Sequence, residues 1–219
     1  MAGADFKQVV KPAVQTEARI LAAAFRRLTR EGYAALRMRE IARDAGVNHA
    51  LINYHFRNKD QLVIAVLDEA NRRLIERQQR MYAAPGGFAR KWEQARRFYT
   101  SDLASGFVRL QGELWAASLS DAGLREKFVP RLLAWKKVVD DAVRQALAML
   151  EANGAGLPAP FSADVIACWI SNFWLGMEFV DLLGAAGKRE HRAALDAMQR
   201  LLVMLDATVK KPPRRTRKK

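Results

Sequence analysis

The chain has 219 residues, 50% of them hydrophobic, and carries one cysteine and a net charge of +14. This length allows one domain or two, and a single cysteine excludes an internal disulfide. No apolar run approaches the roughly 18 residues of a membrane span, and no signal-peptide pattern opens the chain. We therefore expect a cytoplasmic protein without a membrane partner.

The basic residues gather toward the two ends of the chain. Residues 1–60 hold 11 Lys/Arg against 6 Asp/Glu, and residues 61–209 hold 19 against 17. The last ten residues, KKPPRRTRKK, hold 7 basic residues and no acid. Basic ends on a nearly neutral body favour an anionic partner, and nucleic acid is the obvious one. For the last ten residues alone, a solvated tail that aids solubility explains the charge equally well.

The N-terminal part of the chain predicts a flexible arm followed by a helix. Residues 1–15 show no sustained periodicity, so we expect a flexible basic arm there. From Thr16 onward, apolar residues recur at helical spacing, and Gly32 favours a helix end. The residues that form this apolar stripe are Ile20, Leu21, Ala24, Phe25 and Leu28.

Residues 37–56 have the pattern of a helix-turn-helix. The segment from Met38 to Ala45 predicts a short helix, and one face of it carries Ile41, Ala42 and Ala45. Gly46 favours a tight turn, and Asn48 can cap a second helix that runs to about Tyr54. Two helices joined by a short turn with glycine are typical of the unit that places its second helix in the DNA major groove.

At these residues the sequence resembles the TetR family of bacterial transcriptional regulators. The matching positions are Ile41-Ala42, Ala45-Gly46-Val47, Tyr54-His55-Phe56, Lys59 and Leu62. Two positions depart from the family pattern: Arg37 stands where Thr or Ser is usual, and Asn53 stands where Tyr is frequent. The resemblance implies a three-helix DNA-binding domain over residues 16–60, a larger helical ligand-binding and dimerisation domain over residues 61–208, and repression as the usual outcome.

The outward face of the second short helix supplies candidates for DNA contact. If Val47, Ile52 and Phe56 point inward, the outward residues are Asn48, His49, Ala50, Asn53 and Tyr54. Asn53 can form two hydrogen bonds with adenine, and Ala50 can lie against a thymine methyl group. Capping already explains Asn48, and solvation of the helix explains any one of the others.

Phosphate contacts are expected from a different set of residues. Lys59 lies in the first turn of the next helix, where its ammonium and free backbone N–H groups converge on one anion. The resemblance implies that Arg39, Tyr54 and His55 contact the DNA as well. A packed position between helices is the alternative for His55.

The rest of the chain predicts helices only, so we expect an all-α fold with about nine helices. Asn58 and Gln61 suit the start of a long helix that ends before Pro85. Pro130 predicts a kink or a new helix start, and Ser162 suits a helix cap. The other predicted helices cover residues 88–105, 107–119, 122–152, 162–183 and 189–208. Residues 209–219 predict a disordered basic tail.

The two last helices favour a homodimer. The helix at 162–183 is apolar on most sides, which indicates burial on most sides, inside the subunit and against a second copy. Two copies are required because one short helix buries too little surface for operator affinity. A helix wholly inside a monomer is the alternative. The candidate interface residues are Val165, Trp169, Phe173, Met177, Met198, Leu201, Leu202 and Leu205.

Aromatic residues of the C-terminal part suggest a pocket for an unknown small-molecule effector, although aromatic residues at helical spacing are more often plain core. Glu113 lies between Leu110 and Leu114, and a buried acid beside ring faces would suit an organic cation. The candidate lining is Trp92, Phe98, Tyr99, Phe107, Glu113, Trp115, Trp135, Trp169, Phe173 and Trp174.

No enzyme motif is found in the sequence. It has three histidines, none at a metal-ligand spacing, and Cys168 is interpreted as a buried apolar residue. A glycine-rich phosphate loop and a nucleophile elbow are absent as well. We therefore expect no catalytic residue, metal or cofactor. The prediction is a DNA-binding repressor released from a palindromic operator by an effector, and the alternative is an effector-independent architectural or nucleoid-associated dimer.

Overall fold

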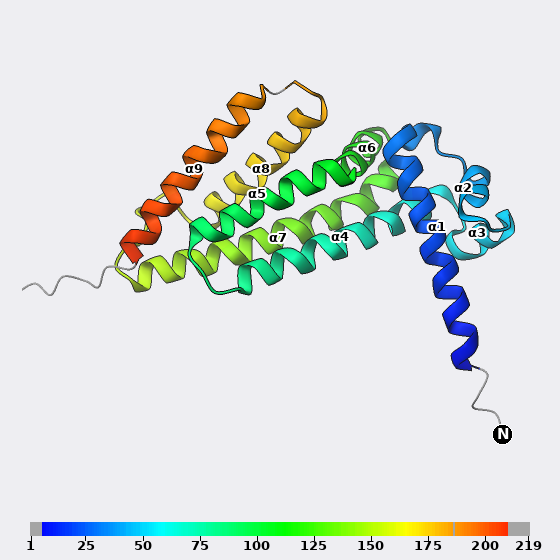
Figure 1. Ribbon diagram of the computed structural model, residues 1–219, viewed down its shortest axis with the longest axis horizontal. Coiled ribbons are helices and arrows are strands. Elements are labelled where there is room, and N and C mark those ends of the chain that lie inside the picture. The colour runs from blue at the N-terminus through cyan, green and yellow to red at the C-terminus, as the bar shows by residue number, and fades with distance from the viewer. Residues whose placement is uncertain (1–5, 186, 210–219) are drawn as a thin grey trace, which may run out of the picture. The chain divides into compact units, whose positions relative to one another are not determined.

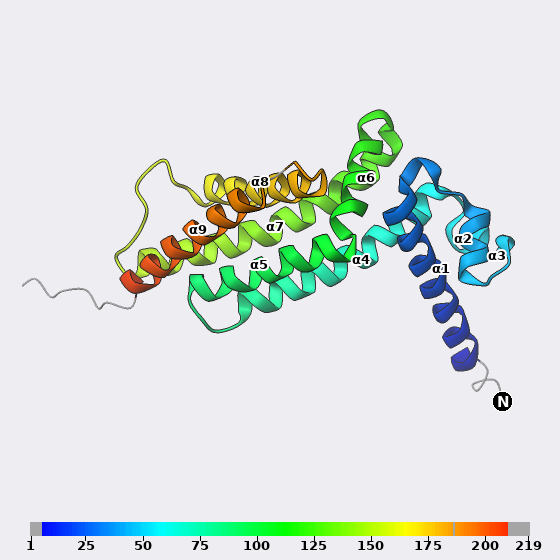
Figure 2. The ribbon, with the colours of Figure 1, turned by 45° about the horizontal axis from the view of Figure 1, so that its top comes forward.

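The computed structural model describes residues 6–185 and 187–209, which form nine helices joined by turns and loops (Figure 1, Figure 2). In chain order they are α1 (Phe6–Ala35), α2 (Met38–Ala45), α3 (His49–Phe56), α4 (Lys59–Ala83), α5 (Phe88–Ser105), α6 (Phe107–Ser120), α7 (Ala122–Ala152), α8 (Ala163–Leu182) and α9 (Lys188–Val209). No strand occurs in these two ranges. The all-α prediction is therefore confirmed.

The helices form two compact units. Unit 1 holds residues up to 72 together with 109–131, and unit 2 holds 73–108 together with the residues from 132 onward. Unit 1 therefore extends past residue 60, where we expected the DNA-binding domain to end. The reason is hydrophobic packing, because buried residues of α4, α6 and α7 complete the core around the helix-turn-helix. The added core residues are Leu62, Val63, Val66, Leu67, Leu110, Leu114 and Phe128.

Helix α1 differs from its prediction at the N-terminal end. It begins at Phe6 rather than at Thr16, so the part of the expected arm from residue 6 is helical, and residues 1–5 lie outside the described ranges. Extending an existing helix adds a hydrogen bond for each residue fixed, whereas only the first turn carries the nucleation cost. The break predicted at Gly32 is confirmed by a backbone φ of 83° and ψ of 170°, after which helical turns continue to Ala35.

The turns around α2 and α3 follow the predicted signals. Gly46 adopts the left-handed conformation, with φ 62° and ψ 43°, and ends α2. The Asn48 side chain accepts a hydrogen bond from the Ala50 N–H at 2.9 Å and so caps α3. Arg37 occupies the N-cap position of α2 without a side-chain cap, yet α2 still begins at Met38 as predicted. Helix α3 continues two residues past the predicted end at Tyr54.

Helix α7 passes through Pro130 without a new start, so that part of the prediction is wrong. Proline lacks the N–H that would bind the Glu126 carbonyl, and the missing bond weakens this turn. The Arg131 guanidinium spans the same turn, because it donates to the Lys127 carbonyl at 2.6 Å and to both Asp68 carboxylate oxygens at 2.7 Å. These contacts hold the weakened turn against α4, which allows the helix to continue.

Unit 2 has a core of its own, in which α5 packs against α8 and α9. Trp92 and Tyr99 of α5 are buried beside Met177 of α8 and Leu195 of α9. The Trp92 indole N–H donates to the Leu195 carbonyl at 3.1 Å, so the ring is fixed in orientation. Ser162 caps α8 as predicted, and the basic tail from residue 210 lies outside the described ranges.

Candidate nucleic-acid interface

Helix α3 is fixed by one face and leaves the other face accessible. Ile52 is fully buried and Phe56 is 5% exposed, so these two side chains hold the helix on the core of unit 1. Each contributes roughly 1.5–3 kcal/mol through burial. On the opposite side Ala50 and Asn53 are exposed, and Tyr54 is 80% exposed. The inward and outward faces expected from the sequence are the observed ones.

Of the remaining candidates, Asn48 at the N-cap is exposed, whereas His49 and His55 of α3 are only partly exposed. The side-chain Oδ1 of Asn48 accepts a hydrogen bond from the Ala50 N–H, which supports capping as the main role of this side chain. His49 is partly exposed. The His55 ring lies between two aromatic neighbours, with ring centroids 5.5 Å from Tyr54 and 5.9 Å from Phe56, and is only partly exposed. Packing therefore accounts for the position of His55, while a DNA contact for it stays a prediction.

Lys59 begins α4 beside α3, and its side chain is not free in solvent. Its ammonium lies 4.1 Å from the centroid of the Tyr33 ring, which is a cation–π contact. Burial lowers the pKa of Lys59, and the positive charge of Arg37 lowers it further. The Tyr33 hydroxyl donates to Asp60 Oδ1 at 2.7 Å. The first turn of α4 is therefore held by a tyrosine that sequence reasoning did not single out.

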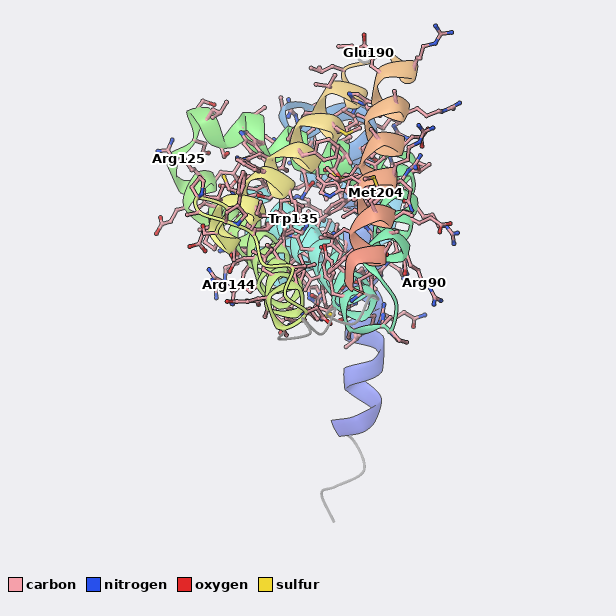
Figure 3. All side chains as sticks on the ribbon, turned by 90° about the vertical axis from the view of Figure 1, so that its left-hand side faces the viewer. Arg90, Arg125, Trp135, Arg144, Glu190 and Met204 are labelled. Carbon is pink, nitrogen blue, oxygen red and sulfur yellow. The ribbon has the colours of Figure 1, made fainter. Side chains whose placement is uncertain are left out.

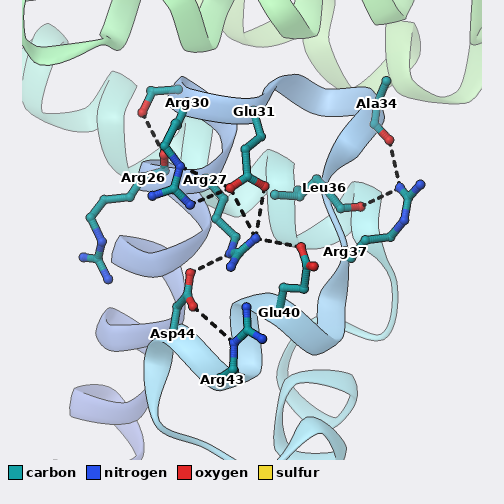
Figure 4. Close-up of polar contacts among 11 residues, drawn as sticks. Arg26, Arg27, Arg30, Glu31, Ala34, Leu36, Arg37, Glu40, Arg43 and Asp44 are labelled. Atoms are coloured by element: carbon teal, nitrogen blue, oxygen red, sulfur yellow. Dashed lines mark hydrogen bonds and ion pairs between the residues drawn. The ribbon is translucent and has the colours of Figure 1, made fainter.

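A buried arginine joins α1 to α2 (Figure 4). Arg27 is 6% exposed and contacts three carboxylates, Asp44 at 2.6 Å, Glu40 at 2.6 Å and Glu31 at 3.0 Å. The hydrogen bond with Arg27 lowers the pKa of Asp44, and contacts with Arg30 and Arg27 lower the pKa of Glu31. This network orients the helix-turn-helix on α1 and compensates acids that would repel DNA.

The exposed surface around α3 carries cations and an apolar residue that sequence reasoning missed. Arg57 follows α3 with a φ of 54°, a conformation uncommon for residues other than glycine, and its side chain is exposed. Arg43 of α2 is exposed over 74% of its side chain, and Arg39 of α2, which was predicted, is exposed as well. Leu51 is 36% exposed beside Ala50. The positive charge of Arg57 next to Lys59 was the available sequence signal.

The residues predicted to line one effector pocket fall into both units. Trp92, Tyr99, Phe173 and Trp174 gather in unit 2, with Trp174 centroids 4.9 Å from Trp92 and 5.6 Å from Tyr99. Phe107 and Trp135 are buried in unit 2, and Phe98 lies 4.7 Å from the Arg77 guanidinium. Trp115 packs on Phe128 in unit 1, and Trp169 is 55% exposed beside Phe161. The predicted set does not form a single site.

Glu113 has a different role from the predicted one. Its carboxylate accepts a hydrogen bond from the Tyr33 backbone N–H at 2.8 Å in unit 1, so it does not line the aromatic cluster of unit 2. In unit 2, Asp102 is buried and pairs with Arg77, and Glu178 is partly buried. Burial and the nearby Asp102 charge raise the pKa of Glu178 to about 8. This acid could not be identified from the sequence, because the charges that act on it, those of Asp102 and Arg77, lie on other helices.

Part of the predicted dimer face packs inside unit 2. Met177 is buried, and Phe173, Met198 and Leu202 pack on the same cluster, so these four belong to the subunit core. Val165 and Leu205 are partly buried, whereas Trp169 and Leu201 are more than half exposed. Cys168 is exposed rather than buried. Of the predicted interface residues, Trp169 and Leu201 therefore remain exposed, and α9 with Met204 faces the viewer in Figure 3. The large apolar residues exposed on α8, directly after it and on α9 include Trp169, Val180, Leu183, Leu201 and Met204.

Two further features of the molecule are its potential metal ligands and the apolar character of α8. Within the described ranges, no group of three or more His, Cys, Asp or Glu side chains is arranged to hold a metal ion. Helix α8 is long and apolar enough to cross a membrane by length and composition alone, with 22% of that stretch buried. Core helices of other proteins pass the same test, and one face of α8 does pack in the core of unit 2.

Comparison with known proteins is consistent with this geometry. Residues 20–66 match the family model described as bacterial regulatory proteins, tetR family. A solved structure described as a TetR-family transcriptional regulator from Rhodococcus sp. is 19% identical, covers 86% of this chain and 98% of its own, and gives a TM-score of 0.63. Among curated proteins, none matches the chain at a significant level.

Two other similar structures were solved with ligands. The transcriptional regulator FadR from Bacillus subtilis, in complex with stearoyl-CoA, is 18% identical over 88% of this chain and 97% of its own, with a TM-score of 0.66. A protein described as a transcriptional regulator from Saccharomonospora viridis, in complex with choline, is 20% identical over 86% and 94%, with a TM-score of 0.60.

A helix-turn-helix with an exposed second helix, followed by a second helical unit, defines a DNA-binding regulator that is built from helices alone. Residues 20–66 match the tetR family of bacterial regulatory proteins, and the chain as a whole has the fold found in solved TetR-family transcriptional regulators. Both the matched family model and the similar solved structures are described as those of transcriptional regulators.

Proposed function

We propose that this protein is a homodimeric, cytoplasmic transcriptional repressor that binds a palindromic DNA operator and is released from it by a small-molecule effector. The observation that carries the proposal is the two-sided character of α3. One side is fixed by Ile52 and Phe56, and the other presents Asn53 and Tyr54 to solvent. A recognition helix needs both properties, because base readout depends on side chains held in a fixed register.

Base and phosphate contacts divide between neighbouring elements in this proposal. Asn53 reads adenine, and Ala50 with Leu51 offers apolar contact to thymine methyl groups. Lys59 binds a phosphate at the start of α4, supported by the exposed cations Arg39 and Arg57. Tyr54 contacts the backbone, and His49 contributes at the helix start.

Dimerisation uses the exposed apolar surface of α8 and α9. Large exposed apolar side chains are typical of interaction surfaces, and Trp169 of α8 and Leu201 and Met204 of α9 are each more than half exposed. A second copy is the occupant that palindromic recognition requires, because two half-sites multiply a weak single contact. If this surface bound a lipid bilayer instead, the protein would float with vesicles and remain monomeric in their absence.

The effector in this proposal is an organic cation. Unit 2 holds two carboxyl groups, the buried Asp102 and the partly buried Glu178, near one guanidinium, that of Arg77. Glu178 has a pKa of about 8 and so holds a proton near neutral pH, and a cationic ligand would favour its ionised form by balancing the one excess negative charge that the three groups then carry. Tyr99 and Trp174 bring aromatic faces to the same unit. Among the similar structures, one holds choline and another stearoyl-CoA, so both polar and lipid ligands occur with this fold.

The test of the proposed function starts with selection of bound sequences from random duplex DNA. The expected result is a palindrome whose complex is resistant to competitor DNA and dissociates when choline or a larger quaternary ammonium compound is added. Release or thermal stabilisation by octanoate alone would contradict the cationic effector. The basic tail favours the architectural alternative, and footprinting separates the two, because that alternative predicts continuous coverage without a selected sequence.

A further inference from the structure

The break in α1 is shaped around a carboxylate from α6. Gly32 has a φ of 83°, and a Cβ built on it would lie 2.7 Å from Oε2 of Glu113 and 3.0 Å from its Cδ. Only glycine leaves room for the carboxylate here. Glu113 uses this room to accept a hydrogen bond from the Tyr33 N–H at 2.8 Å. The contact joins residues 80 positions apart in the chain.

Glu113 is held in place by its own helix. It lies on α6 between Leu110 and Leu114, which are both fully buried in the core of unit 1. An acid fixed in this way presents a charged acceptor to the Tyr33 N–H, and hydrogen bonds with one charged partner are roughly twice as strong as neutral ones. The position of α6 therefore sets the position of the Tyr33 backbone.

Tyr33 contacts the start of α4 through two interactions. Its hydroxyl donates to Asp60 Oδ1 at 2.7 Å, and its ring lies 4.1 Å from the Lys59 ammonium. Burial and the hydrogen bond with Asp60 raise the pKa of the Tyr33 hydroxyl, so it remains a donor. Lys127 of α7 also approaches Asp60, at 3.8 Å. One residue thus connects α6 with the lysine expected to bind a DNA phosphate.

We propose that Glu113 and Tyr33 are positioning residues for DNA binding, through which α6 sets the placement of Lys59 at the phosphate backbone. The inference rests on the proposed function, in which Lys59 contacts a phosphate. Glu113, Tyr33 and Lys59 all lie in unit 1, so the contacts that carry the inference are within one compact unit. Without the hydrogen bond from its N–H to Glu113, Tyr33 is less firmly held, and the cation–π contact between its ring and the Lys59 ammonium is weakened.

The test measures DNA affinity of the full-length protein against salt concentration, on the selected operator and on unrelated duplex DNA. Each phosphate contact contributes about −0.9 to the slope of log affinity against log salt. Lys59→Ala should therefore make the slope shallower by about 0.9 for each DNA-binding domain that contacts the duplex. Glu113→Ala should produce the same change of slope and weaken binding about tenfold at moderate salt. The Lys59→Ala/Glu113→Ala double variant should show no further change of slope, because each substitution removes the same contact between Lys59 and a phosphate.

Three further variants distinguish a loss of folded protein from a loss of the contact between Lys59 and a phosphate. Glu113→Gln retains an acceptor for the Tyr33 N–H and should restore most of the slope. Tyr33→Leu removes the ring beneath Lys59 and should behave like Glu113→Ala. Glu126 is an exposed acid of α7, and Glu126→Ala should leave the slope unchanged. A loss of folded protein lowers the active fraction at every salt concentration and leaves the slope as it was, so slope and melting temperature together separate the two effects.

The outcomes distinguish the inference from the proposed function. If Lys59→Ala leaves the slope unchanged, Lys59 binds no phosphate, and that part of the proposed function fails together with the inference. If Lys59→Ala lowers the slope while Glu113→Ala and Tyr33→Leu do not, the DNA contact stands and the positioning role is wrong. A reduced slope in all three variants with rescue by Glu113→Gln supports the inference.

Discussion

The guanidinium of Arg27 lies 2.6 Å from the carboxylate of Asp44, and this pair joins the helix that precedes the recognition unit to the first helix of that unit. The same arginine reaches Glu31 and Glu40, so one buried cation serves three acids. Removal of Arg27 takes away the one cation that all three carboxylates share, although Glu31 keeps its contact with Arg30. A buried pair that loses one member destabilises a protein far more than a surface pair does.

Arg27→Met should destabilise unit 1 by about 1–3 kcal/mol, the range for hydrogen bonds between charged groups in partly exposed surroundings. Methionine keeps most of the buried volume, so the loss reports the polar contacts. Urea unfolding followed by circular dichroism measures the change. Arg26→Met is the matched control, because Arg26 is the adjacent arginine and its side chain is exposed. Equal stability of the two variants would contradict the structural role of Arg27.

Acid should weaken this network. The pKa of Asp44 is lowered by Arg27, and that of Glu31 is lowered by Arg30 and Arg27, so both acids stabilise the fold when they are ionised. That contribution is present above the ordinary pKa values of 3.8 and 4.5 and is lost as the pH falls through the lower, folded-state values. Asp44→Asn should flatten the acid limb of a plot of unfolding free energy against pH. An unchanged acid limb would rule out the contribution of Asp44.

Glu178 of unit 2 should have the opposite effect on the pH dependence of the unfolding free energy. Its pKa is raised from 4.5 to about 8, so the folded protein holds a proton that the unfolded chain gives up. The free energy of unfolding should therefore fall as the pH rises between these two values. The raised pKa of Asp102 acts in the same direction, and its pairing with Arg77 opposes it.

Glu178→Gln removes the titrating group and should make unit 2 less sensitive to pH between 5 and 8. Unfolding by urea at the two pH values, followed by tryptophan fluorescence, measures the difference. Glu190→Gln is the control, since Glu190 is an exposed acid of the same unit at the start of α9 (Figure 3). A wild-type protein whose stability is flat over this range would show that Glu178 ionises freely.

Dimerisation should depend on the exposed apolar residues of α8 and α9. Leu201 is 57% exposed, so Leu201→Glu should leave the subunit folded and raise the dimer Kd at least about tenfold if the side chain is central to the interface. Sedimentation equilibrium measures the Kd. Leu119→Glu makes the same change at a residue that is 71% exposed in unit 1, and it should leave the dimer intact. A wild-type protein that stays monomeric at micromolar concentration would exclude this interface.

Local signals predicted most of the helices and their ends. Gly46, Asn48 and Asn58 act within two or three residues of their own positions, and the structure has the turn and caps expected of them. The inward face of α3 followed from spacing as well, because Ile52 and Phe56 are four residues apart. Such features depend on neighbours in the chain, so the sequence contains the information.

Contacts between distant segments were not predictable in the same way. Glu113 was interpreted as a pocket acid because its helix is apolar, whereas its partner is a backbone N–H from 80 positions earlier. The face of α8 that packs in the core was misjudged for a similar reason. When a helix is apolar on all sides, its sequence does not indicate which face is buried in the subunit. Pairing of Arg27 with two acids of α2 required knowledge of how α1 and α2 cross.

Recognition of bases by α3 is tested most directly through Asn53, whose side chain is exposed. The measurement compares the affinities of the wild-type protein and Asn53→Ala for the selected operator and for every single-base-pair variant of it. The wild-type protein should lose about 1–3 kcal/mol of binding free energy when one A·T pair in each half-site is replaced, and Asn53→Ala should lose this preference at that pair only. Identical base preferences for the two proteins would contradict base recognition by Asn53.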